Sequence, residues 1–364
     1  APLGPAQQWY FDAAGEQAGL RHFNQSVRLR LRDRVSLQLV RETLHKIVNH
    51  HDALRFRFSV GDQGELMQRY AAEETNVWCE VIEEADAASE CFEERCCVEL
   101  ARLQKSLNPS NGPLLGSLLI KGKETDELVV SIHHLAVDTV SWQILAEDFE
   151  LLLSGSDRAL PTKTTSYSHW ATLLRESVAD RVQLQSEEEA YWRALLPDAI
   201  PPFFSSHSLV DPGLVMDELT IQSSLSTERT QCLVSHAADR PGVGMLALLL
   251  VACSAARRQQ GENTPLVCAL EGHGRDLALG AGLEVNRTVG WFTDIYPISI
   301  SSANESETDF SSSLRQIVSS LTAARRRDIP FVLTKAGRGV RMAMSVNYLG
   351  EVDSTSAMQL LQRV

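Results

Sequence analysis

The sequence predicts an α/β protein of two similar lobes, because helix and strand patterns alternate in both halves of the chain. In the first half, two apolar runs at 114–120 and 128–132 are joined by a short polar turn, which is a hairpin signal. In the second half, an apolar helix pattern at 243–258 precedes strand patterns at 266–270 and 295–300. The length of 364 residues suits two packed lobes, at about 100–200 residues per domain.

Local patterns predict further elements around this frame. Ser36 can cap a helix whose apolar residues fall on one face, and alternation of apolar with polar residues indicates a half-buried strand soon afterwards. A stretch rich in Glu, Ala and Leu favours a helix next. The predicted ranges are a helix at 36–51, a strand at 54–60, and helices at 82–105, 140–153 and around 180–196. The stretch Pro201–Ser206 is where we expect the chain to change lobes.

Composition excludes several classes of function. The net charge of −13 argues against a phosphate-binding surface, and so against binding of nucleic acid, and it favours a soluble cytoplasmic protein. Seven cysteines without a repeated CxxC pair indicate reduced structural thiols and no metal site. The longest apolar run, Met245–Cys253, is well short of the ~18 residues that suggest a membrane span. The N-terminus has no secretory signal pattern, so we expect neither secretion nor membrane insertion.

Two adjacent histidines follow the second strand of the predicted hairpin. His133 and His134 stand at the strand end, where a rigid backbone can present an accessible ring for acid/base work, and Asp138 follows four residues after His134. A bare HxxxD pattern more often marks histidines that are partly buried and satisfied by backbone groups. The complete string HHxxxDxxSW is far more specific, so a catalytic imidazole stands beside the structural alternative.

A carboxylate ends a predicted strand in the second half. Glu271 begins the string Glu271-Gly272-His273-Gly274-Arg275-Asp276, whose glycines indicate a tight turn that can direct side chains into a cleft. By itself the string equally describes a surface turn with an Arg–carboxylate pair of little energetic value. Its significance comes from the imidazole predicted in the other lobe, because one lobe giving His134 and the other Glu271 would make an acid/base pair.

Two later strings are less informative taken alone. Arg287–Pro297 places aromatic residues next to a glycine, which suits an aromatic core as well as the wall of a substrate channel. Ser345–Gly350 offers the amide of Asn347 beside the phenol of Tyr348 on a predicted strand. Strand alternation sends neighbouring side chains to opposite faces, so at most one of the two is expected to face a shared groove.

Taken in order, these strings resemble the epimerization domains of nonribosomal peptide synthetases, within the condensation-domain superfamily. The matching segments are Gly4–Phe11, Arg21–Ser26, HHLAVDTVSW at 133–142, EGHGRD at 271–276, RTVGWFTDIYP at 287–297 and VNYLG at 346–350. Condensation domains share HHxxxD, but they usually follow the aspartate with glycine and lack EGHGR before a GWFT string. This difference favours epimerization.

The resemblance implies a fold and a reaction. It implies two lobes similar to chloramphenicol acetyltransferase, set in a V with a central tunnel. The lobe with HHxxxD would span 1–178, and the lobe with EGHGR and NYLG would span 179–364 and continue beyond Val364. The phosphopantetheine arm of an upstream carrier domain would enter the tunnel with an aminoacyl or peptidyl thioester. The enzyme would invert its α-carbon, L to D, through an enolate.

The resemblance also implies roles for single residues. His134 and Glu271 would act as acid and base from opposite sides, and which of them deprotonates the L-form stays open. Asn347 or Tyr348 would donate a hydrogen bond to the enolate oxygen. His133 and Asp138 would support the site, and family position implies that Asp138 pairs with Arg55. The roles are thus divided between catalytic residues (His134, Glu271) and supporting residues (His133, Asp138, Asn347, Tyr348, Arg55).

No metal or bound cofactor is implied, because the substrate brings its own prosthetic arm. The expected partners are the carrier domain and neighbouring synthetase domains, with no nucleic acid and no membrane. Two rival functions are a condensation domain that forms a peptide bond and a degenerate domain that only docks carriers. The segment Phe331–Arg341 matches the family poorly, and Thr139 occupies a position where glycine is commoner. The sequence does not identify the amino acid or peptide that is inverted.

Overall fold

The computed structural model of the chain describes most of its length. The described residues are 1–14, 22–61, 65–74, 77–83, 91–122, 124–155, 158–197, 221–238, 243–276, 282–300, 310–338, 340, 342, 344–349 and 358–361. They divide into two compact units. The first comprises 1–182, 273–294 and 349–364, and the second comprises 183–272 and 295–348. Both units contain helices and strands, which confirms the predicted α/β class.

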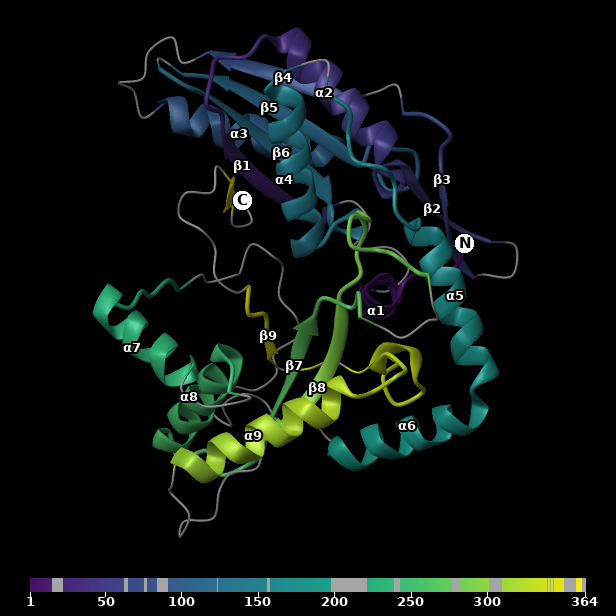
Figure 1. Cartoon of the computed structure of the whole chain (residues 1–364), viewed down its shortest axis with the longest axis vertical. Coiled ribbons are helices and arrows are strands. Elements are labelled where there is room, and N and C mark those ends of the chain that lie inside the picture. Colours follow the sequence, from purple (N-terminus) through teal and green to yellow (C-terminus); the bar gives the residue numbers. More distant parts are fainter. Residues whose placement is uncertain are drawn as a thin grey trace. The chain divides into compact units, whose positions relative to one another are not determined.

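A five-stranded sheet forms the centre of the first unit, in the order β10-β1-β6-β5-β4 (Figure 1). Its strands are β1 (Asn24–Arg30), β4 (Trp78–Glu83), β5 (Leu115–Lys121), β6 (Asp126–His133) and β10 (Met358–Leu361). β4 and β5 are parallel, and the other pairs are antiparallel. The predicted hairpin is confirmed as β5–β6. A strand from the C-terminal end of the chain thus completes the sheet of the first unit.

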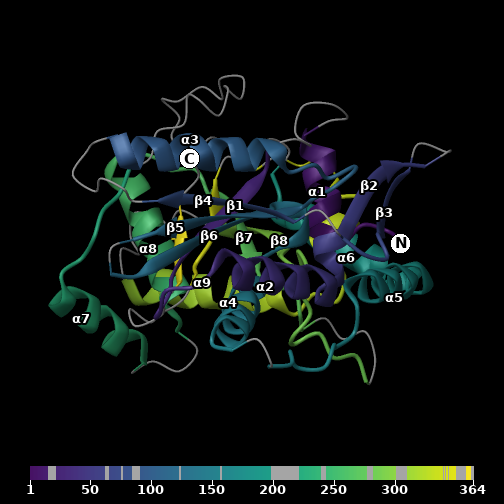
Figure 2. The same ribbon diagram turned by 90° about the horizontal axis from the view of Figure 1, so that it is seen from above.

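Helices cover both faces of this sheet. Figure 2 shows α3 (Cys91–Ser106) on one side and α2 (Leu37–His50) with α4 (Thr139–Leu153) on the other. The strands of the hairpin are largely buried on both faces, as expected of strands covered on both sides. Leu118 and Val129, which are opposite each other in the register, pack with Leu103 of α3. This double coverage makes β6 a rigid base for the residues that follow it.

Two local predictions are confirmed and two are partly wrong. Ser36 caps α2, with its hydroxyl accepting from the Leu39 N–H at 3.1 Å. The helix pattern at 140–153 corresponds to α4. The helix expected over 82–105 begins only at Cys91, because Ile82 belongs to β4 and pairs with β5. The strand expected over 54–60 begins at Phe56, because a 3-10 turn, η1 (Asp52–Arg55), comes first.

The rest of the first unit surrounds the sheet. It contains α1 (Pro5–Ala14), the antiparallel pair β2 (Phe56–Val60) and β3 (Leu66–Tyr70), the 3-10 turn η2 (His134–Ala136) and α5 (Tyr167–Asp180). The sequence patterns predicted no helix where α5 lies. Ser166 caps this helix, accepting from the His169 N–H at 3.2 Å. Two aromatic residues of the helix, Tyr167 and Trp170, are buried. Burial of two large aromatic side chains holds the helix against the unit.

The second unit is built on a three-stranded sheet in the order β8-β7-β9, with β7 and β9 parallel. Its elements are α6 (Val182–Leu195), α7 (Thr227–Ala238), α8 (Met245–Gln259), β7 (Leu266–Gly272), β8 (Asp294–Ile300), α9 (Phe310–Arg325), η4 (Phe331–Leu333) and β9 (Ser345–Val346). Helices α8 and α9 pack side by side (Figure 1). The predictions of α6, α8, β7 and β8 are confirmed. The segment Pro201–Ser206, where we expected the change of lobe, lies outside the described residues.

The units differ from the lobes expected at 1–178 and 179–364: the first boundary lies at 182/183, and two later segments change sides. Segments 273–294 and 349–364 come from the second half of the chain and belong to the first unit. The strings EGHGRD and RTVGWFTDIYP are therefore divided between units. Among the helices that the structure describes, none is both long enough and apolar enough to cross a membrane.

Candidate functional site

The two histidines lie at the junction of β6 and η2, and their surroundings differ. His133 is the last residue of β6 and is fully buried, with its Nδ1 atom accepting from the Leu135 N–H at 3.4 Å. His134 begins η2 and is only half-buried. The His134 N–H donates to the carbonyl of Phe23 at 2.7 Å, which ties the turn to the residue before β1. The surroundings of His133 are those of a buried structural histidine, one of the two alternatives that the sequence left open. His134 is only half-buried, so its ring remains accessible.

The hydrogen bonds of His134 define its tautomer. Nδ1 lies 2.9 Å from the carbonyl oxygen of Val137, which can only accept, so Nδ1 carries the proton. Nε2 lies 2.9 Å from the side-chain amide nitrogen of Gln25. The other end of that amide, Gln25 Oε1, accepts from the indole N–H of Trp142 at 2.8 Å. An indole can only donate, so the Gln25 nitrogen must face His134, and Nε2 carries the lone pair.

Aromatic side chains fix the plane of the His134 ring. Its centroid lies 4.8 Å from that of Phe23, with the rings 18° from parallel, and 4.4 Å from that of Trp291. Trp291 is buried, at 3% exposure, and also contacts Phe23. The GWFT string therefore belongs to an aromatic core, and that core contacts the candidate catalytic ring directly. Packing of this kind restricts ring rotation and keeps Nε2 in one direction.

Asp138 caps helix α4 and joins the His134 turn to another segment. Its Oδ1 accepts from the Ser141 N–H at 2.7 Å, and its Oδ2 accepts from the Phe292 N–H at 3.0 Å. The Arg275 guanidinium donates to Oδ1 at 3.0 Å. Asp138 is 3% exposed, so these three donors satisfy a carboxylate that would otherwise be costly to bury. Thr139, the bulkier residue at the position where glycine is commoner, begins α4 and is exposed.

The predicted ion pair between Arg55 and Asp138 is wrong. The Arg55 guanidinium pairs with Asp52 at 2.8 Å and donates to the carbonyls of Val48 and Asn49, each at 2.7 Å. These carbonyls lie in the last turn of α2, where a cation is favoured by the free acceptors and the helix dipole. The tight η1 turn directs Arg55 back onto its own helix and away from Asp138.

Arg275 is the partner of Asp138, a role that the sequence analysis missed. Its side chain is 8% exposed. Its Nη1 donates to the carbonyls of Val285 and Thr288 at 2.8 and 2.7 Å. Its guanidinium carbon lies 4.0 Å from the Phe292 ring centroid. The alternative of a weak surface turn is therefore wrong, because this pair is buried. The signal that could have found it is the Gly-His-Gly-Arg string itself.

The glycine before this arginine is required by a close backbone approach. Gly274 has φ +64°, and a Cβ atom there would lie 1.9 Å from the carbonyl oxygen of Phe292. Any side chain would push the turn away from the segment that carries Trp291 and Phe292. The glycine thus allows Arg275 to reach Asp138.

Glu271 lies at the end of β7 in the second unit, next to β9. Parallel pairing of the two strands sets Ala269 opposite Ser345, so the residues just beyond lie side by side. The Asn347 amide donates to Glu271 Oε2 at 2.8 Å, and the Ser345 hydroxyl donates to Oε1 at 3.4 Å. Burial raises the pKa of Glu271, although the bond from Ser345 acts in the opposite direction. A carboxyl group of this kind holds a proton at higher pH than an exposed glutamate does.

The roles assigned to Asn347 and Tyr348 stay predictions. The Asn347 amide donates to Glu271 in this structure, which makes it a positioning group for that carboxylate. Tyr348 is 43% exposed. Donation by either residue to an enolate oxygen depends on a bound substrate.

One further titratable group, where the first unit's segment 273–294 ends and β8 begins, was not anticipated. Asp294 begins β8, and its Oδ1 atom is buried without a hydrogen-bond partner among the described residues. Burial and, secondarily, repulsion from Asp276 raise the pKa of Asp294 to about 7. Nothing in the sequence distinguishes this aspartate, because its desolvation comes from packing.

Comparison with known proteins identifies the relatives of the chain. The family model named Condensation domain matches residues 1–351. Bacitracin synthase 2 of Bacillus licheniformis is 31% identical over 364 residues, covering 97% of this chain and 14% of the relative. Surfactin synthase subunit 1 of Bacillus subtilis (strain 168) is 29% identical over 375 residues, covering 99% and 10%. The chain thus spans only about a tenth to a seventh of these relatives.

Solved structures with the same fold include two kinds of domain. The epimerization domain from the third module of tyrocidine synthetase B matches with a TM-score of 0.79 and 28% identity, over 99% of this chain and 82% of that one. The first condensation domain of the CDA synthetase matches with a TM-score of 0.76 over 98% and 84%, at 16% identity. The second match supports the fold alone, whereas the first also shares sequence along nearly the whole chain.

Proposed function

This chain belongs to the condensation-domain family, and we propose that within it the chain is an epimerization domain. It inverts the α-carbon of an aminoacyl or peptidyl group held as a thioester on the phosphopantetheine of a carrier domain. The similarity to an epimerization domain at 28% identity supports this assignment over the other activities of the family. The other synthetase domains and the identity of the product belong to the larger assembly.

Inversion of such a carbon needs two proton transfers. The thioester carbonyl acidifies the α-proton, because the carbanion that remains is delocalised as an enolate. One group removes the proton from one face of the carbon, and another group returns a proton to the opposite face. A hydrogen-bond donor at the enolate oxygen lowers the energy of the intermediate. No oxidant, metal or external cofactor takes part in this scheme.

The proposal rests mainly on the surroundings of Glu271. Inversion requires a second acid/base group besides the imidazole, and Glu271 has the properties of one. Burial raises its pKa toward the working range of a proton-transfer group, while Asn347 and Ser345 hold both of its oxygens. An exposed carboxylate would hold its proton too weakly to return it efficiently. Formation of a peptide bond has no evident need for this arrangement.

His134 supplies the other proton-transfer group. The Nδ1–H bond to Val137 leaves Nε2 as the basic atom, and the contacts with Phe23 and Trp291 hold the ring still. To react, Nε2 exchanges its bond with the Gln25 amide for the substrate proton. Both assignments of the two roles remain open: His134 deprotonates the L-form and Glu271 reprotonates the carbanion, or the reverse.

Exchange with solvent tests the proposal directly. The chain is incubated in D₂O with an L-aminoacyl thioester on a phosphopantetheinylated carrier, with no acceptor present, and the released amino acid is examined by mass spectrometry and chiral chromatography. We expect deuterium at the α-position together with the D-enantiomer. Absence of both would overturn the proposal. Peptide formation only when an acceptor carrier is added would identify a condensation domain, and binding of the carrier without either reaction would identify a docking domain.

A further inference from the structure

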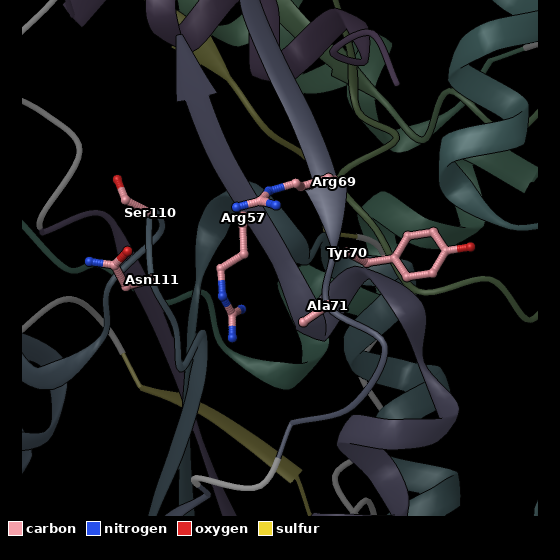
Figure 3. Close-up of a pocket in the computed structure, with 6 residues that line it drawn as sticks. All are labelled: Arg57, Arg69, Tyr70, Ala71, Ser110 and Asn111. Carbon is pink, nitrogen blue, oxygen red and sulfur yellow. The ribbon is translucent and has the colours of Figure 1, made fainter. Parts of the chain in front are cut away.

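A basic pocket lies in the first unit, formed by the β2–β3 hairpin and the loop that precedes β5. Its volume is about 240 Å³. Figure 3 shows Arg57 and Arg69 on the hairpin with Ser110 and Asn111 on the loop beside it, while the Tyr70 ring points away from the two arginines. None of these residues has a part in the proposed epimerization. The pocket therefore calls for a separate explanation.

The two arginines are direct neighbours across the hairpin. In the antiparallel register Arg57 is opposite Arg69, so their side chains project from the same face of the pair. Like charges directly opposite each other destabilise a sheet. Within the described residues, Arg57 pairs with Glu74, whereas Arg69 is exposed and pairs with no carboxylate. Among the described residues, one positive charge in the pocket, that of Arg69, therefore has no carboxylate partner.

Arg57 is held in a fixed position. Its side chain is 12% exposed, and its guanidinium donates to the carbonyl of Phe56 at 2.9 Å as well as binding Glu74. It also lies directly against Gly112, where φ is +78° and a Cβ atom would be 2.2 Å from Nη2. A side chain at Gly112 would displace this guanidinium. The arginine is therefore preorganised, which reduces the entropy that a ligand must overcome on binding.

The opposite wall is also rigid. The Asn108 side chain accepts from the N–H groups of Ser110 and Asn111 at 2.9 and 3.0 Å. The N–H of Phe58 on β2 donates to the carbonyl of Pro109 at 2.9 Å, so the loop is bonded to the hairpin. Ser110 and Asn111 thus keep a hydroxyl and an amide at the edge of the pocket, and both groups can donate to an oxyanion.

We propose that this pocket binds a phosphate group. Guanidinium groups bind phosphate through parallel, charge-assisted hydrogen bonds, and two guanidinium groups can engage different oxygens of one phosphate. The chain carries a net charge of −13, so two neighbouring arginines in one pocket are not a consequence of its general composition. Because Glu74 already pairs with Arg57, a phosphate bound here would mainly compensate the charge of Arg69. The group can come from a phosphate ester such as that of a phosphopantetheine arm, or from free phosphate.

Calorimetric titration of the whole chain tests this inference. The probes are inorganic phosphate, phosphopantetheine and pantetheine, which lacks the phosphate. We expect saturable binding of the phosphorylated probes that weakens with added salt, and at least about a tenfold loss of affinity in Arg69→Gln. The matched control is Arg181→Gln, at an exposed arginine after α5, which should bind as the wild type does. Tighter binding of phosphopantetheine than of inorganic phosphate would assign the prosthetic arm as the source, and equal binding would assign free phosphate.

Thermal unfolding provides a second measurement. The variant Arg69→Gln again serves for comparison, because it removes the arginine that pairs with no carboxylate among the described residues. Phosphate should raise the midpoint of the wild type more than that of this variant. The proposal is overturned if neither phosphorylated probe binds, if pantetheine binds as tightly as phosphopantetheine, or if Arg69→Gln and Arg181→Gln bind equally well.

Discussion

The side-chain amide of Gln25 donates to Nε2 of His134 at 2.9 Å, and it can do so in only one orientation. Trp142 fixes that orientation, because its indole N–H occupies Gln25 Oε1 at 2.8 Å. A ring protonated on Nε2 would place its N–H against the amide N–H of Gln25, which is unfavourable. Gln25 therefore favours the neutral ring with a basic Nε2 atom, and we infer that it is a positioning residue for His134.

Replacement of this residue by glutamate tests that role. In Gln25→Glu the carboxylate still accepts from Trp142, and its second oxygen attracts a proton on Nε2 of His134. We expect the limb of the pH–rate profile that reports His134 to move to higher pH, because the carboxylate stabilises the protonated ring. This is the acidic limb if His134 is the base in the measured direction, and the basic limb if it is the acid. The matched control is Gln38→Glu, at an exposed position on α2. Equal profiles for the two variants would contradict the role.

The two proposed acid/base groups should be individually necessary. His134→Ala and Glu271→Gln should each lower L-to-D conversion by about 10²–10⁴-fold, the contribution of one positioned acid or base. Because a single base can still serve one face, α-exchange from one enantiomer should survive in each variant. Measurement of deuterium entry from the L- and D-substrates separately would then assign the two roles. Unchanged conversion in Glu271→Gln would refute the two-group mechanism.

The buried pair of Arg275 and Asp138 should show strong energetic coupling. Their side chains are 8% and 4% exposed, so removal of either one leaves a buried charge. Arg275→Met and Asp138→Asn should each lower the free energy of unfolding by about 3–5 kcal/mol, and the double variant should lose less than the sum. Urea unfolding measures all three. A parallel cycle of Arg55→Met with Asp138→Asn should be additive within about 0.5 kcal/mol, because these residues do not pair.

Asp294 should make stability depend on pH. Its pKa of about 7 in the folded chain is above the ordinary aspartate value of 3.8, so the folded state binds the proton more tightly than the unfolded state. Stability from this group is present below pH 4 and is lost as pH rises toward 7. Asp294→Asn, which cannot ionise, should therefore gain stability relative to the wild type between pH 4 and pH 8. A constant difference in unfolding midpoint across that range would contradict the shift.

Cysteine reactivity should follow burial. Burial raises the pKa of Cys268 to about 12 and also raises the pKa of Cys79, and the thiolate is the reactive form. Cys97 and Cys232 are exposed. In the folded chain at pH 8, iodoacetamide should label the exposed pair within minutes and leave the buried pair unmodified, as read by peptide mass spectrometry. The buried thiols should react once urea is added, and rapid labelling of Cys268 without urea would contradict its burial.

Local secondary structure was largely predictable from the sequence. The β5–β6 hairpin follows from two apolar runs around a polar turn, and the start of α2 follows from the hydroxyl of Ser36. Both signals depend on neighbouring residues only. The prediction at 82–105 failed at its beginning for the opposite reason, because pairing of β4 with β5 overrides the helical preference of residues 82–83.

The candidate site shows the same division. Its side-chain types and their order along the chain were readable, and His134 stands at a strand end as expected. The orientation of Nε2 was not readable, because it depends on Gln25 and Trp142, which lie far apart in the sequence. The raised pKa values of Glu271 and Asp294 were equally inaccessible, because desolvation is a property of packing.

By itself, therefore, the sequence determined the α/β class, the family motifs and the candidates His134 and Glu271. Only the tertiary structure decided which groups meet them. Asp138 pairs with Arg275 at 3.0 Å, although Arg55 was the expected partner. The physical reason is that an arginine binds the acceptors that the folded backbone brings within reach. The η1 turn returns Arg55 to the end of α2, and the close approach at Gly274 carries Arg275 to Asp138.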